Sequence, residues 1–326
     1  MDKMDLIKSC VEQEMLKFED SFERALSTHV PLADNVIHYF LDRRGKQLRP
    51  VVTLLAAKMV GGEVSDMAIQ GAVALELLHN ASLMHDDVID KSDERRGMSS
   101  INKVWDNKVA VLMGDFFLSK CLVASNSTGS LVISNILANM VIRLSEGELE
   151  QLSNVRSHLL SESAYFSVIS GKTASLFSAC MKIGALSAGS SEEIVDRMGQ
   201  IGELMGLVFQ IRDDIFDYYP SVDIGKPSGH DIMEGKVTLP LLYALQHGPA
   251  EESEKMRALL EGSRELNHDQ VEQLVEFAKA VGGIEYAQAK MKNIAFDAKK
   301  LLDMQSPSPA RDALKALIDY FIDRNH

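Results

Sequence analysis

Residues 73–90 read VALELLHNASLMHDDVID, an apolar run that ends in the acidic pattern Asp-Asp-x-x-Asp. The same pattern ends a second apolar run, residues 201–217, which read IGELMGLVFQIRDDIFD. Within both runs the apolar residues recur every three or four positions, which is typical of a helix with a buried face. The repetition predicts two long helices at matching positions in the two halves of one helical bundle.

The remaining sequence also favours helices. Only eight of the 326 residues are proline, and alternating strand patterns and Asn-Gly or Asp-Gly hairpin signals are scarce. Apolar residues recur at helical spacing in six segments: 5–26, 51–60, 66–85, 131–152, 194–219 and 271–303. Turns are expected at 61–62, 125–130 and 189–191, and a long loop at 220–236. We therefore predict an all-α protein that forms a large single domain over residues 1–326.

Composition narrows the class of protein and its compartment. The 47 acidic and 34 basic residues give a net charge of −13, which argues against a nucleic-acid-binding protein. Cys10, Cys121 and Cys180 form neither a metal-ligand spacing nor a disulfide framework, so we expect a reducing, cytoplasmic location. The first residues do not resemble a signal peptide, and no membrane-spanning helix is expected.

The aspartates of each motif are spaced to bind a metal ion. A helix advances about 100° per residue, so the first aspartate of each motif and the aspartate four positions later lie on the same face. The middle aspartate lies roughly 100° away and is predicted to support the ligands. Two acidic motifs behind buried runs favour a metal site over a solvated helix end, and hard carboxylate oxygens favour Mg²⁺ completed by substrate phosphates. The carboxylates are those of Asp86, Asp87, Asp90, Asp213, Asp214 and Asp217.

Basic residues form several separate clusters, many of them beside glycine, which permits close approach to a ligand. Arginine binds phosphate oxygens through two hydrogen bonds, and lysine supplies a point charge. The clusters hold Lys46, Arg49, Arg95, Arg96, Lys172, Lys226 and Lys236. Together with two acidic motifs, they predict two diphosphate subsites facing an apolar cavity, and therefore a hydrocarbon attached to the diphosphate.

Five ordered motifs resemble those of the trans-isoprenyl diphosphate synthase, or polyprenyl synthetase, family over nearly the whole chain. They read GKQLRP, LLHNASLMHDDVIDKSDERRG, GDFFLSK, GKTASLF and FQIRDDIFDY…GKPSGHDIMEGKVTLP. The resemblance implies the all-α isoprenoid synthase fold around a central cavity, Mg²⁺ and a homodimer. It also implies repeated head-to-tail condensation of isopentenyl diphosphate onto an allylic diphosphate primer, farnesyl or geranylgeranyl diphosphate.

The resemblance also implies a role for each matching residue. Isopentenyl diphosphate would be held by Lys46, Arg49, His79 and Arg96. The metal would be held by Asp86, Asp90 and Asp213, supported by Asp87, Asp214 and Asp217. The allylic diphosphate would be held by Arg95, Lys172, Thr173, Gln210, Lys226 and Lys236. The catalytic set would comprise the six aspartates with Lys172 and Lys226. The loop 220–236 would then act as a lid that excludes water from the carbocation.

Product length is predicted from the helical turn before the first acidic motif. Small residues there, Ala81 and Ser82, leave room for a growing chain, whereas short-chain members of the family tend to carry aromatic residues. We therefore expect a long product of roughly octaprenyl class, like a quinone side chain. Release of such an amphiphilic product would involve transient contact with a membrane.

Three other functions remain open from the sequence. A short-chain synthase making farnesyl or geranylgeranyl diphosphate would share every motif. A non-catalytic partner subunit that binds prenyl diphosphate tends to lose its acidic motifs, and both are intact here. A metal phosphohydrolase, suggested by His85-Asp86, would need more histidine ligands than His79 alone provides near the motif.

Overall fold

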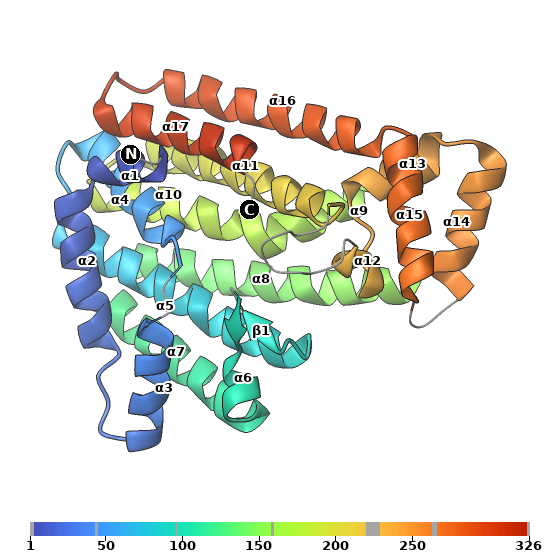
Figure 1. Ribbon diagram of the computed structural model, residues 1–326. Coiled ribbons are helices and arrows are strands. Elements are labelled where there is room, and N and C mark those ends of the chain that lie inside the picture. Colours follow the sequence, from blue (N-terminus) through green and yellow to red (C-terminus); the bar gives the residue numbers. More distant parts are fainter. Residues whose placement is uncertain are drawn as a thin grey trace. The chain divides into compact units, whose positions relative to one another are not determined.

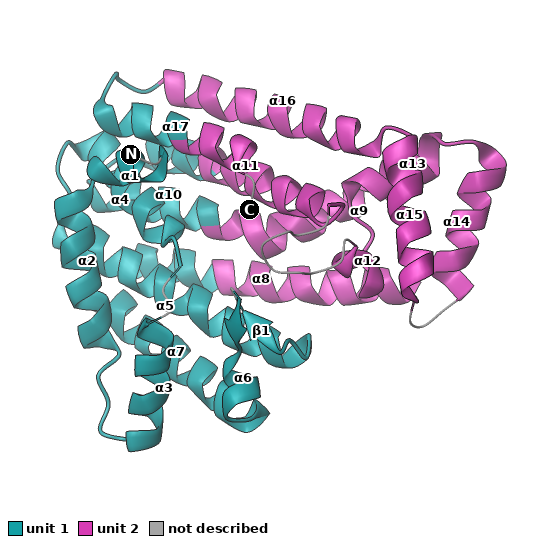
Figure 2. Ribbon diagram, in the orientation of Figure 1, with its two compact units in different colours: residues 1–139, 177–199, 305–316 teal, residues 140–176, 200–304, 317–326 magenta. Residues whose placement is uncertain are grey.

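The computed structural model describes residues 3–42, 45–95, 97–157, 160–219, 229–262 and 266–324. These residues form helices joined by short turns, with one two-stranded hairpin (Figure 1). The predicted all-α class is therefore confirmed. Two compact units are distinguished in Figure 2, which colours them separately. Unit 1 comprises residues 1–139, 177–199 and 305–316, and unit 2 comprises residues 140–176, 200–304 and 317–326.

Unit 1 is organised around α5, the helix that carries the first acidic motif. Helix α5 packs along α7 and also contacts α2 and α4. The unit contains α1 (Lys3–Ser9), α2 (Glu12–Ala25), α3 (Pro31–Leu41), α4 (Leu48–Gly61), α5 (Asp66–Ile89), β1 (Glu94–Arg95), β2 (Met98–Ser99), α6 (Ile101–Val104) and α7 (Asn107–Ser127). Parts of α8 (Leu131–Ser157), α10 (Ser175–Ser187), α11 (Glu192–Phe216) and α17 (Pro309–Asp323) also belong to it.

The ends of α5 explain where its aspartates lie. Ser65 caps the N-terminus, because its hydroxyl oxygen accepts a hydrogen bond from the amide of Ala68 at 3.3 Å. Most of the helix is buried, so it is held as a core element up to its last turn. The chain leaves the helix at Asp90 and then reverses at Lys91, whose φ is 51°. The acidic motif therefore occupies the C-terminal end of a rigid buried helix.

Unit 2 holds the second acidic motif, at the C-terminal end of α11. Helix α13 contacts α9, α14, α15 and α16 there. Its own elements are α9 (Glu162–Ile169), the π-helix η1 (Ser170–Ala174), α12 (His230–Met233), α13 (Leu239–His247), α14 (Ala250–Gly262), α15 (His268–Ala280) and α16 (Gly283–Asp303). The remaining portions of α8, α10, α11 and α17 complete it.

The structure differs from the predicted helices at identifiable places. The segment 271–303 is two helices, because Gly282 adopts a φ of 89° between α15 and α16. The segment 5–26 is likewise divided, between α1 and α2. Residues 220–228 of the predicted loop lie outside the described part of the chain, and 230–233 form α12.

Helix α7 meets a test of length and composition for a membrane-spanning segment, which leaves the expectation of no such helix a prediction. Among the described residues it alone is long and apolar enough to cross a membrane by length and composition. Its buried residues include Ala110, Met113, Phe117 and Cys121, and the helix packs along α5. A core helix of a globular protein meets the same test; in α7 one side packs along α5, and 39% of the apolar window is buried.

Candidate active site

The first acidic motif is held by a hairpin that follows it. Asp87 is buried, and Arg95 on strand β1 donates to its Oδ1 from Nε at 2.9 Å and also from Nη2. The carbonyl of Asp87 accepts a hydrogen bond from the amide of Ser92 at 2.9 Å. Arg95 therefore neutralises the middle aspartate, the position predicted to support the metal ligands.

The other two aspartates of this motif lie nearer to solvent. Asp86 is half-buried and Asp90 is exposed. His79, two turns earlier, is buried with 8% of its surface exposed. His85 points elsewhere: its Nε2 lies 3.4 Å from Asp115 Oδ1, and its ring packs where a β-carbon on Gly114 would stand. Asp86 and Asp90 are thus the accessible carboxylates at the end of α5.

The two positions predicted to set product length differ in exposure. Ala81 is buried, with 2% of its surface exposed. Ser82 is half-buried, and its hydroxyl donates to the carbonyl of His79 at 2.9 Å. The serine therefore satisfies its own polar group within the helix.

The remaining predicted residues of unit 1 lie at the start of α4. Lys46 is exposed, and Gln47 adopts a left-handed conformation with a φ of 52°. The guanidinium of Arg49 lies 5.5 Å from the centre of the Phe177 ring. The tight turn at Gln47 separates the two cations and begins the helix. Arg96 lies outside the described residues.

In the second motif the middle aspartate is again the most buried. Asp214 accepts hydrogen bonds from the hydroxyl of Tyr165 at 2.6 Å and from Nε2 of Gln210 at 2.8 Å. The hydroxyl of Thr173 donates to Oε1 of Gln210 at 2.6 Å. A chain of hydrogen bonds therefore runs from the π-helix to the acidic motif and includes two of the predicted diphosphate-binding residues.

Asp217 and Asp213 have different partners. Oδ1 and Oδ2 of Asp217 accept hydrogen bonds from the amides of His230 and Asp231, at 2.9 and 3.0 Å, and thereby bind the start of α12. Asp213 Oδ1 accepts a hydrogen bond from Nη2 of Arg324 at 2.5 Å. Asp217 is therefore held by backbone amides, whereas Asp213 has a cation as a partner.

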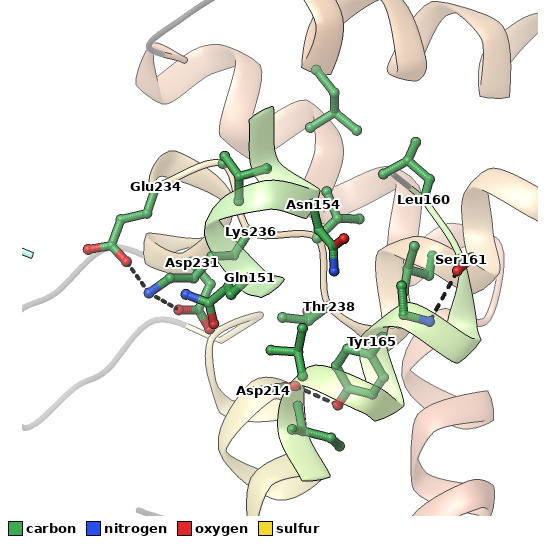
Figure 3. A pocket seen from close by; sticks show the side chains of 18 of the residues that line it. Gln151, Asn154, Leu160, Ser161, Tyr165, Asp214, Asp231, Glu234, Lys236 and Thr238 are labelled. Carbon is green, nitrogen blue, oxygen red and sulfur yellow. Dashed lines mark hydrogen bonds and ion pairs between the residues drawn. The ribbon is translucent and has the colours of Figure 1, made fainter. Parts of the chain in front are cut away.

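The second motif borders a cavity of about 690 Å³ within unit 2 (Figure 3). Four predicted diphosphate-binding residues line it, from α9–η1, α11 and the segment after α12, and Asp214 lines it as well. Val168, Leu242 and Leu260 give it apolar walls. The predicted residues on this cavity are Lys172, Thr173, Gln210 and Lys236. The structure thus gathers side chains from segments that are distant in the sequence. The other predicted lysine, Lys226, lies outside the described residues.

Both lysines of the cavity are paired with acids. Lys172 Nζ lies 2.7 Å from Glu148 Oε1. Lys236 Nζ lies 2.5 Å from Glu234 Oε2 and 3.9 Å from Asp231 Oδ1 (Figure 3). These carboxylates hold the ammonium groups at the cavity wall, where an anionic ligand would exchange with them.

Burial raises the pKa of three aspartates in and beside this cavity. Burial, followed by the charge of Asp231, raises the pKa of Asp214 to about 8. The same two causes, in the same order, raise the pKa of Asp217 to about 6. Burial also raises the pKa of Asp231, although Lys236 opposes the shift. These shifts indicate a crowded set of carboxylates that a cation would stabilise.

The sequence identified only part of this set. Asp231 and Glu234 belong to the motif HDIMEGK, in which only the lysine was predicted to bind a ligand. Tyr165 stands seven positions before Lys172, which a helical reading could have placed on a similar face. The contacts of Glu148 and Arg324 depend on packing between distant segments, and no local pattern indicated them.

Comparisons with known proteins agree with these motifs. Residues 30–278 match the family model described as Polyprenyl synthetase. The chain is 34% identical to the octaprenyl diphosphate synthase of Haemophilus influenzae over 99% of this chain and 98% of that protein. The polyprenyl synthase of Caulobacter crescentus, solved with calcium and isoprenyl diphosphate, is 32% identical with a TM-score of 0.91, covering 99% and 98% of the two chains.

A solved structure with a different product name is also similar. The geranylgeranyl pyrophosphate synthase of Bacteroides thetaiotaomicron is 39% identical, with a TM-score of 0.86, over 99% of this chain and 100% of that chain. The similar proteins therefore share one fold while their names differ in product length.

Proposed function

The chain belongs to the polyprenyl synthetase family, and we propose that within it the protein is a long-chain synthase of roughly octaprenyl class. As a trans-prenyl diphosphate synthase it is a prenyltransferase with the all-α isoprenoid synthase fold. In our proposal it adds isopentenyl diphosphate repeatedly to farnesyl or geranylgeranyl diphosphate. The observation that carries the proposal is the cavity beside Asp214, which gathers an acidic motif, two lysines, Thr173 and Gln210.

We propose Mg²⁺ as the metal, with Asp86 and Asp90 as its ligands in unit 1 and, separately, Asp213 as a ligand in unit 2. Among the described side chains no three histidine, cysteine or acidic groups are gathered closely enough to hold a metal on their own. This donor set fits Mg²⁺, which commonly takes one or two carboxylates and completes its coordination with phosphate and water oxygens. When bound, Mg²⁺ would neutralise negative charge on the allylic diphosphate.

The residues of the cavity suit the departure of a diphosphate. Heterolysis of the allylic C–O bond leaves a delocalised carbocation, and the bonding electron pair goes to pyrophosphate. In our proposal, Lys172 and Lys236 stabilise the charge on this leaving group, and Thr173 contributes a hydroxyl. The double bond of isopentenyl diphosphate then attacks the cation. The released pyrophosphate takes the proton that must finally leave.

Binding of isopentenyl diphosphate is assigned to the residues at the start of α4 and on α5. Lys46 and Arg49 are the cations there, and His79 lies two turns before Asp86. We also assign Arg96 to this subsite and Lys226 and Arg95 to the allylic one. Arg95 would then divide its donors between Asp87 and the diphosphate, which a five-donor guanidinium permits.

Long-chain specificity is proposed from the turn of α5 before Asp86. Ala81 and Ser82 are small, so they would not obstruct a prenyl chain that extends along this helix. A short-chain synthase is the main alternative, because the similar geranylgeranyl synthase has the higher identity. A non-catalytic partner subunit is less well supported, since both acidic motifs are intact.

A homodimer is proposed from the exposed side of α7. Four apolar side chains of this helix are between 40% and 65% exposed: Val111, Leu112, Leu122 and Val123. A second copy covering this side would remove apolar surface from water. We further propose a cytoplasmic location and transient membrane contact during product release, because a long prenyl diphosphate is amphiphilic.

The decisive experiment measures product length. The purified full chain is incubated with Mg²⁺, labelled isopentenyl diphosphate and either primer, and products are separated by chromatography. We expect chains near octaprenyl length and loss of product in Asp86→Asn. Products that stop at geranylgeranyl would establish the short-chain alternative. Absence of turnover with either primer would favour the partner-subunit alternative.

A further inference from the structure

Arg324, near the end of the chain, contacts the aspartate that we propose as the metal ligand of the second motif. Its Nη2 donates to Asp213 Oδ1 at 2.5 Å and to the carbonyl of Phe209 at 2.9 Å. The arginine side chain is 10% exposed, whereas that of Asp213 is 39% exposed. The cation thus approaches Asp213 from the protein side and leaves the carboxylate accessible to solvent.

The position of Arg324 is fixed by aromatic rings and by a second arginine. Its guanidinium carbon lies 4.0 Å from the centre of the Phe209 ring and 5.5 Å from that of Phe216. Arg212 donates to the carbonyl of Arg324 from Nε at 3.1 Å and from Nη2 at 2.7 Å. Residues of α11 hold both the side chain and the backbone of Arg324. The ion pair with Asp213 is therefore fixed by several contacts, unlike an isolated ion pair on the surface.

Electrostatics gives this contact a consequence for metal binding. A guanidinium and a divalent cation on the same carboxylate repel each other, because both carry positive charge. A metal ion alone would therefore bind Asp213 poorly while Arg324 remains in contact. A diphosphate brings negative charge that offsets this repulsion, so metal and diphosphate together would be accepted.

We propose that Arg324 is a positioning residue that makes divalent-metal binding at Asp213 depend on the diphosphate. The C-terminal arginine supplies the positive charge that Asp213 holds before substrate arrives, and it disfavours metal ions that arrive alone. This inference rests on the proposed function, because it takes Asp213 as a metal ligand. A residue of the C-terminal segment would then influence how tightly Asp213 binds the metal ion.

The test measures binding of Mn²⁺ to the full chain, with free Mn²⁺ followed by electron paramagnetic resonance. Without pyrophosphate, Arg324→Gln is expected to bind Mn²⁺ at least about threefold more tightly than the unmodified protein. Arg324→Lys, which keeps the charge, is expected to change the affinity less. With inorganic pyrophosphate present, the unmodified protein should gain more affinity than Arg324→Gln does, because only the former has the repulsion to relieve.

Two further variants separate the possible results. Lys299→Gln is the control: it removes an ion pair with Asp319 on α17, and this pair does not include Asp213. The Mn²⁺ affinity of this variant should equal that of the unmodified protein. Adding Asp213→Asn to Arg324→Gln should abolish the gain, because the gain requires that carboxylate. Unchanged or weaker binding in Arg324→Gln, in protein that remains folded by circular dichroism, would overturn the inference.

The proposed function is tested separately in the same samples. If the unmodified protein makes polyprenyl products but Arg324→Gln shows no gain in Mn²⁺ affinity, the inference fails and the function stands. If Asp213→Asn alone leaves Mn²⁺ binding with pyrophosphate unchanged, the metal role proposed for Asp213 fails. A gain confined to Arg324→Gln and absent from the double variant supports both.

Discussion

A β-carbon on Gly147 would lie 2.9 Å from the backbone nitrogen of Lys172, so α8 and the π-helix η1 meet at backbone contact. The reverse holds for Gly171, whose β-carbon would lie 2.9 Å from the carbonyl oxygen of Arg143. Arg143 also donates to Ser170 Oγ and to Glu203 Oε1, both at 2.8 Å. Two glycines and this polar cluster together fix the turn that presents Lys172 to the cavity.

Gly147→Ala is expected to destabilise the protein by about 1–3 kcal/mol, because the added methyl group meets backbone that cannot rotate away. It should also weaken binding of the allylic diphosphate, since Lys172 would be displaced. Chemical denaturation and substrate titration measure the two effects. Gly262→Ala is the control for stability, because a β-carbon added there would meet nothing within 4 Å; the substrate titration is compared with the unmodified protein, since Gly262 lines the cavity. Equal behaviour of the two variants would contradict this account.

Tyr165→Phe removes one hydrogen-bond donor from buried Asp214 while keeping the aromatic ring. We expect a loss of about 1–3 kcal/mol in the free energy of unfolding, because a buried polar group loses a partner. Tyr219→Phe, at a tyrosine that is 49% exposed, should cost much less. Urea denaturation of both variants checks the prediction, and similar small losses in both would refute it.

Ser82→Phe is expected to shorten the prenyl product, because an aromatic ring one turn before Asp86 would block chain growth along α5. Ser82 is the better position to test, since it is half-buried. Ala81 is only 2% exposed, so a phenylalanine at position 81 would disturb the core. Ser82→Ala should leave the product length unchanged. Chromatography of labelled products decides, and an unaltered length in Ser82→Phe would count against the proposed path.

A surface cluster in unit 2 should give the protein a pH-dependent contribution to stability. Burial alone would raise the pKa of Glu162, but hydrogen bonds from Lys290 and Tyr286 outweigh it and hold the pKa below its ordinary value of 4.5. The stabilisation is therefore present above pH 4.5 and is lost as the pH falls further and the carboxylate becomes protonated.

Lys290→Met should accordingly lower the free energy of unfolding by about 0.5–1 kcal/mol at pH 7, a small value because the ion pair is partly exposed. The difference from the unmodified protein should shrink in acid. Lys292→Met, at an exposed lysine of the same helix, serves as the control. Thermal unfolding across pH 3–7 measures both, and a difference that persists unchanged in acid would rule out Glu162 as its origin.

The three cysteines should differ in reactivity. Burial raises the pKa of both Cys121 and Cys180 to about 12; it also raises the pKa of Cys10, but that side chain is half-exposed. A chromogenic disulfide reagent at pH 8 should therefore modify Cys10 in the folded protein, and the other two only after denaturation. Rapid reaction of more than one thiol per folded chain would contradict the burial.

Local patterns predicted the long helices well, because α5 and α11 carry regular apolar spacing and end in the same acidic motif. They failed where a helix is broken by backbone geometry, as at Gly282. The aspartates and lysines of the site were identifiable as residue types with chemical uses. Their actual partners were not, because Tyr165 and Arg324 reach the second motif only through tertiary packing.

The π-helix at Ser170–Ala174 also constrains how this sequence can change. A π-turn accommodates one residue more than a regular helix of the same length. Deleting one residue there would let α9 and α10 join as an ordinary helix with the flanking side chains close to their present orientations, but it would remove the wide turn that carries Lys172 and Thr173 at the cavity. Insertions and deletions in this stretch should therefore be far less tolerated than substitutions, and protein engineers recombining segments of such enzymes should not place a crossover within it.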